Sequence, residues 1–162
     1  MERIGVNTKS MLKKCVVLLL LCILSTATAV YAASGDDILG VWNNEEHDAK
    51  IEIFKCGGKY CGKIVSVKEP NYPADSKEGV PGTPRLDGKN PDSAKKTKPI
   101  IGLQIVSDFI LDGKGVWKGG SVYDPKNGKT YRGKITLVSP NKLNLRGFVG
   151  ITLFGRTTSW TR

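Results

Sequence analysis

Short segments of alternating apolar and polar residues follow one another through the carboxyl-terminal part of the chain, from residue 102 to residue 162. Turn-forming sequences at residues 112–115, 124–129, 139–142 and 150–153 separate five of these segments. Alternation over a few residues indicates a half-buried β-strand, and tight-turn residues between two such runs are typical of a hairpin. This part of the sequence therefore predicts an antiparallel meander.

Extended toward the amino terminus, the same pattern predicts eight strands. They are expected at residues 39–45, 50–56, 59–67, 102–111, 116–123, 129–138, 143–149 and 154–161. Apolar residues such as Leu103, Ile105 and Phe109 share one face, whereas charged residues such as Lys134 lie on the other. Eight such strands favour an all-β fold, a closed antiparallel up-and-down barrel, because closure leaves no unpaired edge. A two-sheet sandwich is the alternative.

A proline-rich connection interrupts this pattern between the third and fourth predicted strands. Six of the eight prolines lie within residues 70–99, which excludes regular strands there. Asn90, Pro91 and Asp92 have the order of an N-cap, a first-turn proline and an acidic residue, so a short helix is expected at residues 91–96. Long connections in compact domains are commonly functional, so we interpret this one as a lid; a disordered connection is the alternative.

Loops that follow odd-numbered strands of an up-and-down barrel lie at one end. The long connection, the 124–129 turn, the turn at Gly150 and His47 are therefore expected to surround the barrel mouth, while the other turns close the opposite end.

Candidate ligand-binding residues follow from this arrangement of the mouth. Two tyrosines flank the 124–129 turn on the apolar face, and an arginine follows the turn at Gly150 on the same face as two aromatic residues. The predicted ligand-contacting residues are Tyr123, Asp124, Tyr131, Phe154 and Arg156. Each also has a structural interpretation, as a cross-strand pair, a turn residue or a surface arginine.

Two cysteines lie in the predicted hairpin between the second and third strands. Pairing of Cys56 with Cys61 would place Ile53 opposite Ile64 and both sulfur atoms outside the core. In an oxidising compartment the cysteines are expected to form a disulfide that contributes about 2 kcal/mol for so short a loop. A redox pair or a metal site is disfavoured, since redox motifs have two intervening residues and no histidine or second cysteine pair completes a zinc shell.

The first 33 residues have the pattern of a secretory signal peptide. Two lysines precede an apolar run at residues 15–24, and small residues end the segment. The run is about half of the roughly 20 apolar residues that span a bilayer, which disfavours a membrane anchor. We expect cleavage after Ala32 or Ala33, no transmembrane anchor after cleavage, and a single periplasmic or secreted domain at residues 34–162.

The charge of the chain bears on its partners. The whole chain has a net charge of +10; the first 33 residues contain four Lys/Arg and one Glu, which leaves 21 basic and 14 acidic residues, a net charge of +7. Outside the cytoplasm such a surface attracts anionic lipids, polysaccharides or acidic proteins. The basic residues are scattered without interleaved aromatic residues, so nucleic acid is not an expected partner.

Catalytic chemistry has little support in the sequence. His47 is the only histidine and lies in a polar turn, and Asp87 and Asp124 lie in turn-forming contexts. No spacing of histidines, cysteines and carboxylates suggests a metal shell, and no glycine-rich loop suggests phosphate binding. We expect a protein that is not an enzyme and that has no metal or cofactor.

Five segments, taken in order, carry a resemblance to a known family. They lie at residues 56–64, 86–92, 117–125, 145–150 and 155–162, and together they resemble the secreted bacterial family called domain of unknown function (DUF) 2147. The resemblance implies a lipocalin-like barrel in the bacterial envelope, with no established ligand or reaction. Gly40, Val41 and Trp42 also resemble the start of a lipocalin-type barrel, which implies a structural base formed by Trp42, Trp160 and Arg162.

The predicted function is the non-catalytic binding of a small hydrophobic or amphipathic ligand, or an anionic one, inside the barrel. Eight-stranded barrels are either filled by side chains or just able to hold one small ligand, so this hypothesis requires a cavity of roughly 300 Å³ or more. The alternative is an envelope protein-interaction or inhibitory module that engages an acidic partner through its basic surface or its long loop.

Overall fold

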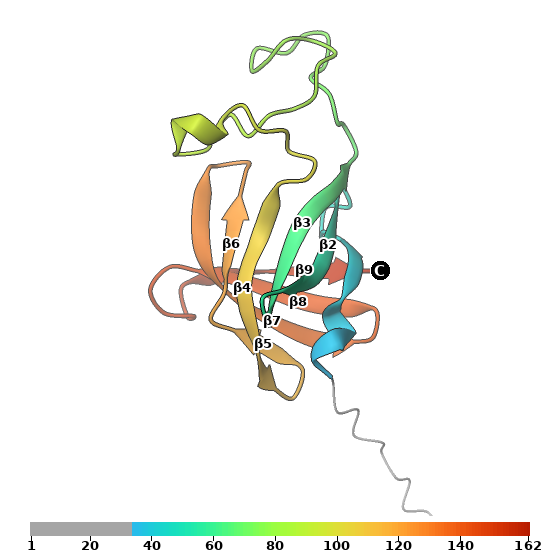
Figure 1. The fold of residues 1–162 in the computed structure, drawn as a ribbon, viewed down its shortest axis with the longest axis vertical. Helices are drawn as coiled ribbons and strands as arrows, with labels where there is room; N and C mark the ends of the chain where they lie inside the picture. Colours follow the sequence, from blue (N-terminus) through green and yellow to red (C-terminus); the bar gives the residue numbers. More distant parts are fainter. Residues whose placement is uncertain (1–33) are drawn as a thin grey trace, which may run out of the picture. The chain divides into compact units, whose positions relative to one another are not determined.

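The computed structural model describes residues 34–162, which form an antiparallel β-barrel (Figure 1). The strands are β1 (Gly40–Asn43), β2 (Ala49–Cys56), β3 (Lys59–Val67), β4 (Gln104–Gly113), β5 (Val116–Lys118), β6 (Ser121–Asp124), β7 (Lys129–Ser139), β8 (Lys142–Phe148) and β9 (Gly155–Thr161), with 3-10 helices η1 (Gly35–Ile38) and η2 (Ser93–Lys95). The expected signal peptide and its cleavage site lie outside the described residues. Within the described part of the chain, no helix has the length and apolar character needed to span a bilayer.

The nine strands form an eight-stranded closed barrel. Neighbours follow the order β3-β2-β1-β9-β8-β7, then β5 and β6, then β4, and the pairing of β3 with β4 completes the ring. Strands β5 and β6 share one position, because both pair with β4 on one side and β7 on the other. The predicted eight-stranded barrel is confirmed, and the sandwich is excluded. The other seven predicted strands differ from the observed bounds by two residues or fewer.

The strand expected at residues 116–123 is divided into β5 and β6, and this division has a steric cause. A Cβ atom at Gly120 would lie 2.3 Å from the ring of Phe109, which is fully buried. A Cβ at Gly133, on the neighbouring strand β7, would lie 2.2 Å from the same ring. The Phe109 ring therefore fits against the barrel wall because two glycines have no side chain there. The strand is interrupted at one of them, Gly120, which lies between β5 and β6.

The β2–β3 hairpin contains the predicted disulfide. Gly57 and Gly58 form a two-residue turn with φ angles of 56° and 79°, the left-handed conformation that favours glycine in tight hairpins. Cys56 and Cys61 are diagonal neighbours with Cα atoms 5.9 Å apart and are joined by a disulfide.

The register of this hairpin differs from the prediction. Ile64 lies opposite Ile51 rather than Ile53, because two residues form the turn instead of four. The pairing is shifted by two residues, an even number, so each side chain remains on its expected face of the sheet. Ile51, Ile53 and Ile64 are all buried. Cys61 pairs with Phe54 on the face opposite these isoleucines, and neither cysteine belongs to the buried core cluster, as expected, although Cys61 is only 4% exposed.

Helix η1 and the last residue of the chain lie at the base of the barrel. Trp42 is fully buried, and its Nε1 donates a hydrogen bond to the carbonyl of Ile38 at 2.8 Å. The guanidinium carbon of Arg162 lies 4.3 Å from the centroid of the Trp42 ring, and its nitrogens donate to the carbonyls of Asp37 and Leu39. These contacts hold η1 against the end of the barrel opposite the long β3–β4 connection (Figure 1).

The connection between β3 and β4 contains η2 and two isolated bridges, Asn71 with Pro84 and Leu86 with Pro99. The expected helix at residues 91–96 is shorter than predicted. Its N-cap is Asp92, whose Oδ1 accepts a hydrogen bond from the Ala94 amide at 3.0 Å. Asn90 does not cap this helix: its Oδ1 accepts a hydrogen bond from the Asp92 amide at 2.9 Å, one position before the helix begins, and its Nδ2 donates to a buried carboxylate described below.

Candidate functional site

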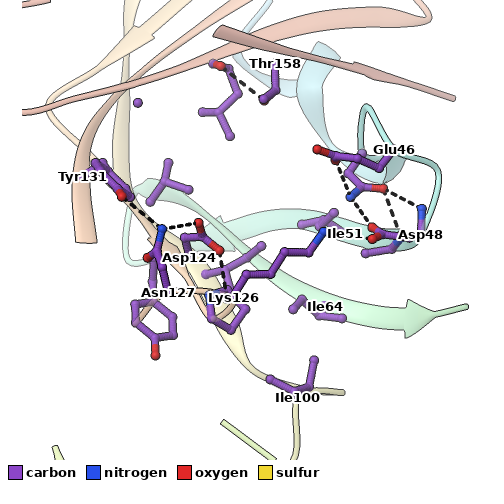
Figure 2. Close-up of a pocket in the computed structure, with 18 of the residues that line it drawn as sticks. Glu46, Asp48, Ile51, Ile64, Ile100, Asp124, Lys126, Asn127, Tyr131 and Thr158 are labelled. Atoms are coloured by element: carbon purple, nitrogen blue, oxygen red, sulfur yellow. Dashed lines mark hydrogen bonds and ion pairs between the residues drawn. The ribbon is translucent and has the colours of Figure 1, made fainter. Parts of the chain in front are cut away.

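A pocket of about 1360 Å³ opens at the end of the barrel where the long connection lies (Figure 2). It is lined by inward-facing strand residues and by the β1–β2, β3–β4, β6–β7 and β8–β9 connections, the four that the sequence pattern assigns to the mouth. His47 does not line the pocket, although its neighbours Glu46 and Asp48 do. The volume, which includes the space between the mouth loops, exceeds the roughly 300 Å³ of a small-ligand site.

The inner wall of the pocket is apolar. Its buried members include Ile51, Ile64, Ile105, Leu145 and Trp160, all less than 9% exposed. Trp160, which the family resemblance places at the structural base, also lines the pocket, whereas Trp42 and Arg162 do not. A wall of this composition suits an apolar group and offers few polar partners.

Gly147 leaves part of this interior open. It lies on β8 directly opposite Gly133, whose missing side chain would point at the buried Phe109 ring, so both glycines face inward. A Cβ at Gly147 would meet only Tyr131, at the ordinary contact distance of 3.4 Å. A larger residue at Gly147 would therefore project into the pocket rather than into packed atoms.

The structure places all five predicted ligand-contacting residues on the pocket wall. These are Tyr123, Asp124, Tyr131, Phe154 and Arg156. The Asp124 carboxylate is occupied within its own turn, where it accepts hydrogen bonds from the Lys126 amide and from Asn127 Nδ2. Asn127 Nδ2 also donates to the Tyr131 hydroxyl at 3.1 Å. Their polar atoms thus shape the mouth, and ligand contact through these residues stays a prediction.

Tyr123 joins the barrel to the long connection through a buried carboxylate. Its hydroxyl donates a hydrogen bond to Asp87 Oδ1 at 2.7 Å, and Asn90 Nδ2 donates to Asp87 Oδ2 at 2.6 Å. Asp87 is fully buried. Burial of the phenol, together with its hydrogen bond to Asp87, raises the pKa of Tyr123 to about 12. The hydroxyl is thus a fixed donor at neutral pH, and only the ring is free to contact a ligand.

The role of Asp87 was not evident from its turn-forming sequence context. The only sequence signal is its place in the 86–92 segment that carries the family resemblance.

An ion pair crosses the rim of the pocket. Lys126 extends from the β6–β7 turn toward the β1–β2 turn, where its Nζ lies 2.9 Å from Asp48 Oδ2 (Figure 2). Burial alone would raise the pKa of Asp48, but hydrogen bonds from Lys126 and Asn44 outweigh it and hold the pKa below its ordinary value. The same contact raises the pKa of Lys126. Both groups are therefore charged near neutral pH, and the pair ties two mouth loops together.

The other rim charges are largely paired as well. The pairs are Arg85 with Glu69 at 2.9 Å, Lys89 with Glu78 at 3.8 Å, and Arg156 with Glu45 and Glu46 at 3.6 and 3.8 Å. Lys68 also lines the pocket and forms no ion pair within residues 34–162. The rim is thus polar and of mixed charge, with Lys68 as a cation that an incoming polar group can contact.

No group of three or more histidine, cysteine or carboxylate side chains suited to a metal ion occurs within the described part of the chain.

Comparisons with known proteins agree with the shape of the barrel. A family model described as "Uncharacterized protein conserved in bacteria (DUF2147)" matches residues 40–162. The solved structure of protein HP1028 from Helicobacter pylori, described as belonging to the lipocalin family, has a TM-score of 0.63 and 25% sequence identity, covering 76% of this chain and 81% of its own. No curated protein matches the sequence.

Proposed function

The chain belongs to the uncharacterised bacterial family DUF2147, and we propose that its barrel binds one small hydrophobic or amphipathic molecule without converting it chemically. The observation that carries this proposal is the pocket of about 1360 Å³, whose inner wall is apolar and whose rim is polar. The similarity to a structure described as a lipocalin supports it, because eight-stranded barrels of that type can hold a small ligand.

The two zones of the pocket suggest how such a ligand is oriented. Its apolar part would lie against Ile51, Ile105 and Leu145, where each methylene removed from water stabilises the complex by about 0.8 kcal/mol. Its polar end would remain at the rim, where Lys68 is available and the other charges already have partners. An amphipathic molecule with a polar or anionic head group fits this arrangement of an apolar inner wall and a polar rim.

Export to the bacterial envelope is part of the proposal. The Cys56–Cys61 disulfide is compatible with an oxidising compartment such as the periplasm. An envelope protein would meet amphipathic molecules where they occur at high local concentration.

Native mass spectrometry of the protein purified from its own bacterial envelope tests this function. We expect a fraction of the protein to carry one small-molecule adduct that organic solvent releases and that tandem mass spectrometry identifies as amphipathic. Recovery of only unliganded protein together with a captured protein partner would contradict the proposal and favour an interaction module that acts through the basic surface or the long loop.

A further inference from the structure

The β8–β9 connection exposes a group of large apolar side chains on the rim of the pocket. Four of its six residues between positions 149 and 154 are large, apolar and mostly exposed: Val149 (68%), Ile151 (59%), Leu153 (74%) and Phe154 (73%). Single exposed apolar residues are ordinary on protein surfaces, whereas a contiguous group indicates an interaction site. Val149, Leu153 and Phe154 also line the pocket, so this apolar loop borders the mouth.

Arg146 on β8 forms hydrogen bonds to the backbone of the apolar loop, residues 149–154. Its guanidinium donates to the carbonyls of Thr152 and Leu153 at 2.7 and 3.1 Å and to Thr157 Oγ1 at 2.9 Å. The Phe154 amide donates to the Ile151 carbonyl at 3.2 Å. Two loop carbonyls thus have a charged donor from the barrel itself, which fixes the backbone conformation that presents the apolar side chains.

Basic residues without acidic partners lie beside the apolar loop. Lys134 on β7 pairs across the ladder with Arg146, and Arg132 pairs with Phe148, the last residue before the loop. None of these three cations forms an ion pair with a carboxylate of the described chain, although ten such pairs occur elsewhere on it. Apolar side chains flanked by unpaired cations are the combination that binds anionic membrane interfaces.

We propose that the apolar loop of residues 149–154 docks on the surface of an anionic lipid bilayer, with its side chains among the lipid headgroups and the pocket mouth facing the membrane. A second copy of the chain is a poorer occupant, because a symmetric contact through this loop would bring Arg132, Lys134 and Arg146 against the same cations of the partner. Docking does not require an occupied pocket. If the proposed function also holds, an amphipathic ligand can pass between bilayer and pocket without crossing water.

Co-sedimentation with vesicles tests the docking. The full chain is purified, its amino terminus is defined by intact mass, and it is mixed with phosphatidylcholine vesicles with or without phosphatidylglycerol. We expect binding to the anionic vesicles that weakens with added salt. Ile151→Asp should lower the partition coefficient at least about tenfold, because it removes an inserted side chain and adds a charge repelled by the lipid.

Val138→Asp is the matched control. Val138 is 55% exposed, lies at the base end of β7 near the Pro140 carbonyl that accepts from Arg162, and does not line the pocket, so the substitution makes the same change of net charge at the end of the barrel opposite the mouth. We expect this variant to bind vesicles within about twofold of the unmodified protein, since net charge alone is a small part of the attraction. The combined Arg132→Gln and Lys134→Gln substitutions supply a second test, in which binding to anionic vesicles should fall while the apolar loop is intact.

Several outcomes would overturn the docking proposal. They are absence of binding to anionic vesicles, equal binding to neutral vesicles, equal effects of Ile151→Asp and Val138→Asp, or a dimer in light scattering that Ile151→Asp abolishes. A separate titration with a dansyl-labelled fatty acid in solution, without vesicles, tests the proposed ligand binding independently of membrane docking. Because Ile151 does not line the pocket, that binding should persist in Ile151→Asp. If the unmodified protein did not bind the fatty acid, the proposed function would be contradicted, but the docking proposal would not be affected.

Discussion

At the residue scale, the buried Asp87 carboxylate shows how the pocket mouth is assembled. A carboxylate removed from water is costly unless donors replace its hydration. Here Tyr123 donates from the barrel wall, and Asn90 donates from within the long connection. The backbone amide of Asp87 also donates to the Lys98 carbonyl, and its own carbonyl accepts from the Asn90 amide. One side chain therefore fixes the connection to β6 and holds it over the pocket.

The pKa of Tyr123 makes this contact measurable. Because folding favours the neutral phenol and raises its pKa from 10.0 to about 12, the associated stability is fully present below pH 10 and is lost as the pH rises through about 12. We expect Tyr123→Phe to lower the free energy of unfolding at neutral pH by about 1–3 kcal/mol, because it removes a donor from a buried carboxylate.

Urea denaturation of both proteins at pH steps across this window is the measurement. The difference between the unmodified protein and Tyr123→Phe should be constant below pH 10 and should shrink between pH 10 and pH 12. A difference that does not change with pH would contradict the assigned hydrogen bond.

At the element scale, the strands could be predicted because their alternation is local. The expected strand at residues 59–67 matches β3, and most other bounds shift by one or two residues. The division between β5 and β6 could not be predicted, because it depends on the Phe109 ring from another strand. The hairpin register was missed although its signal is local: the adjacent glycines Gly57 and Gly58 are typical of a two-residue turn, whereas the expected pairing of Cys56 with Cys61 required four residues.

The candidate site was predictable to a similar extent. Up-and-down connectivity alone brings the four mouth connections together, and residues beside those turns, such as Tyr131 and Arg156, consequently line the pocket. Contacts that span the sequence, such as Asp87 with Tyr123 and Lys126 with Asp48, have no local pattern. Helix η1 has only four residues and thus no periodicity to detect.

The β6–β7 turn packs closely against the long connection at Gly128. This glycine has a φ of +71°, and a Cβ there would lie 2.0 Å from the Lys89 carbonyl oxygen. We expect Gly128→Ala to combine the cost of a left-handed alanine, about 1–2 kcal/mol, with displacement of the long connection from the turn. Urea and thermal denaturation measure the stability loss.

Gly82→Ala is its control. Gly82 has a φ of +79° in the long connection, and a Cβ there would meet no atom within 4 Å beyond its two neighbours in the chain. Gly82→Ala should therefore lose only the stability that a left-handed alanine costs, about 1–2 kcal/mol. Equal losses for Gly128→Ala and Gly82→Ala would contradict the close packing of the turn on the connection.

At the scale of the whole molecule, the barrel has two ends with different roles. Trp42, Arg162 and η1 lie together at the base, where Trp42 is fully buried and hydrogen bonds join η1 to both side chains. The opposite end keeps an open pocket bordered by paired charges and by the apolar loop. The residues that hold η1 at the base, Trp42 and Arg162, do not line the pocket, so a substitution in the pocket can be tested without removing the contacts of the base.

The most direct test of the central claim is a fluorescence titration of a dansyl-labelled fatty acid into the unmodified protein, Gly147→Leu and Ser66→Leu. Leucine at Gly147 enters the pocket, whereas Ser66 is exposed on β3 and does not line it. We expect saturable one-site binding to the unmodified protein and to Ser66→Leu, and at least about tenfold weaker binding to Gly147→Leu, because overfilling a pocket costs about 1–3 kcal/mol. Equal affinities for all three proteins, or no binding to any of them, would contradict the account.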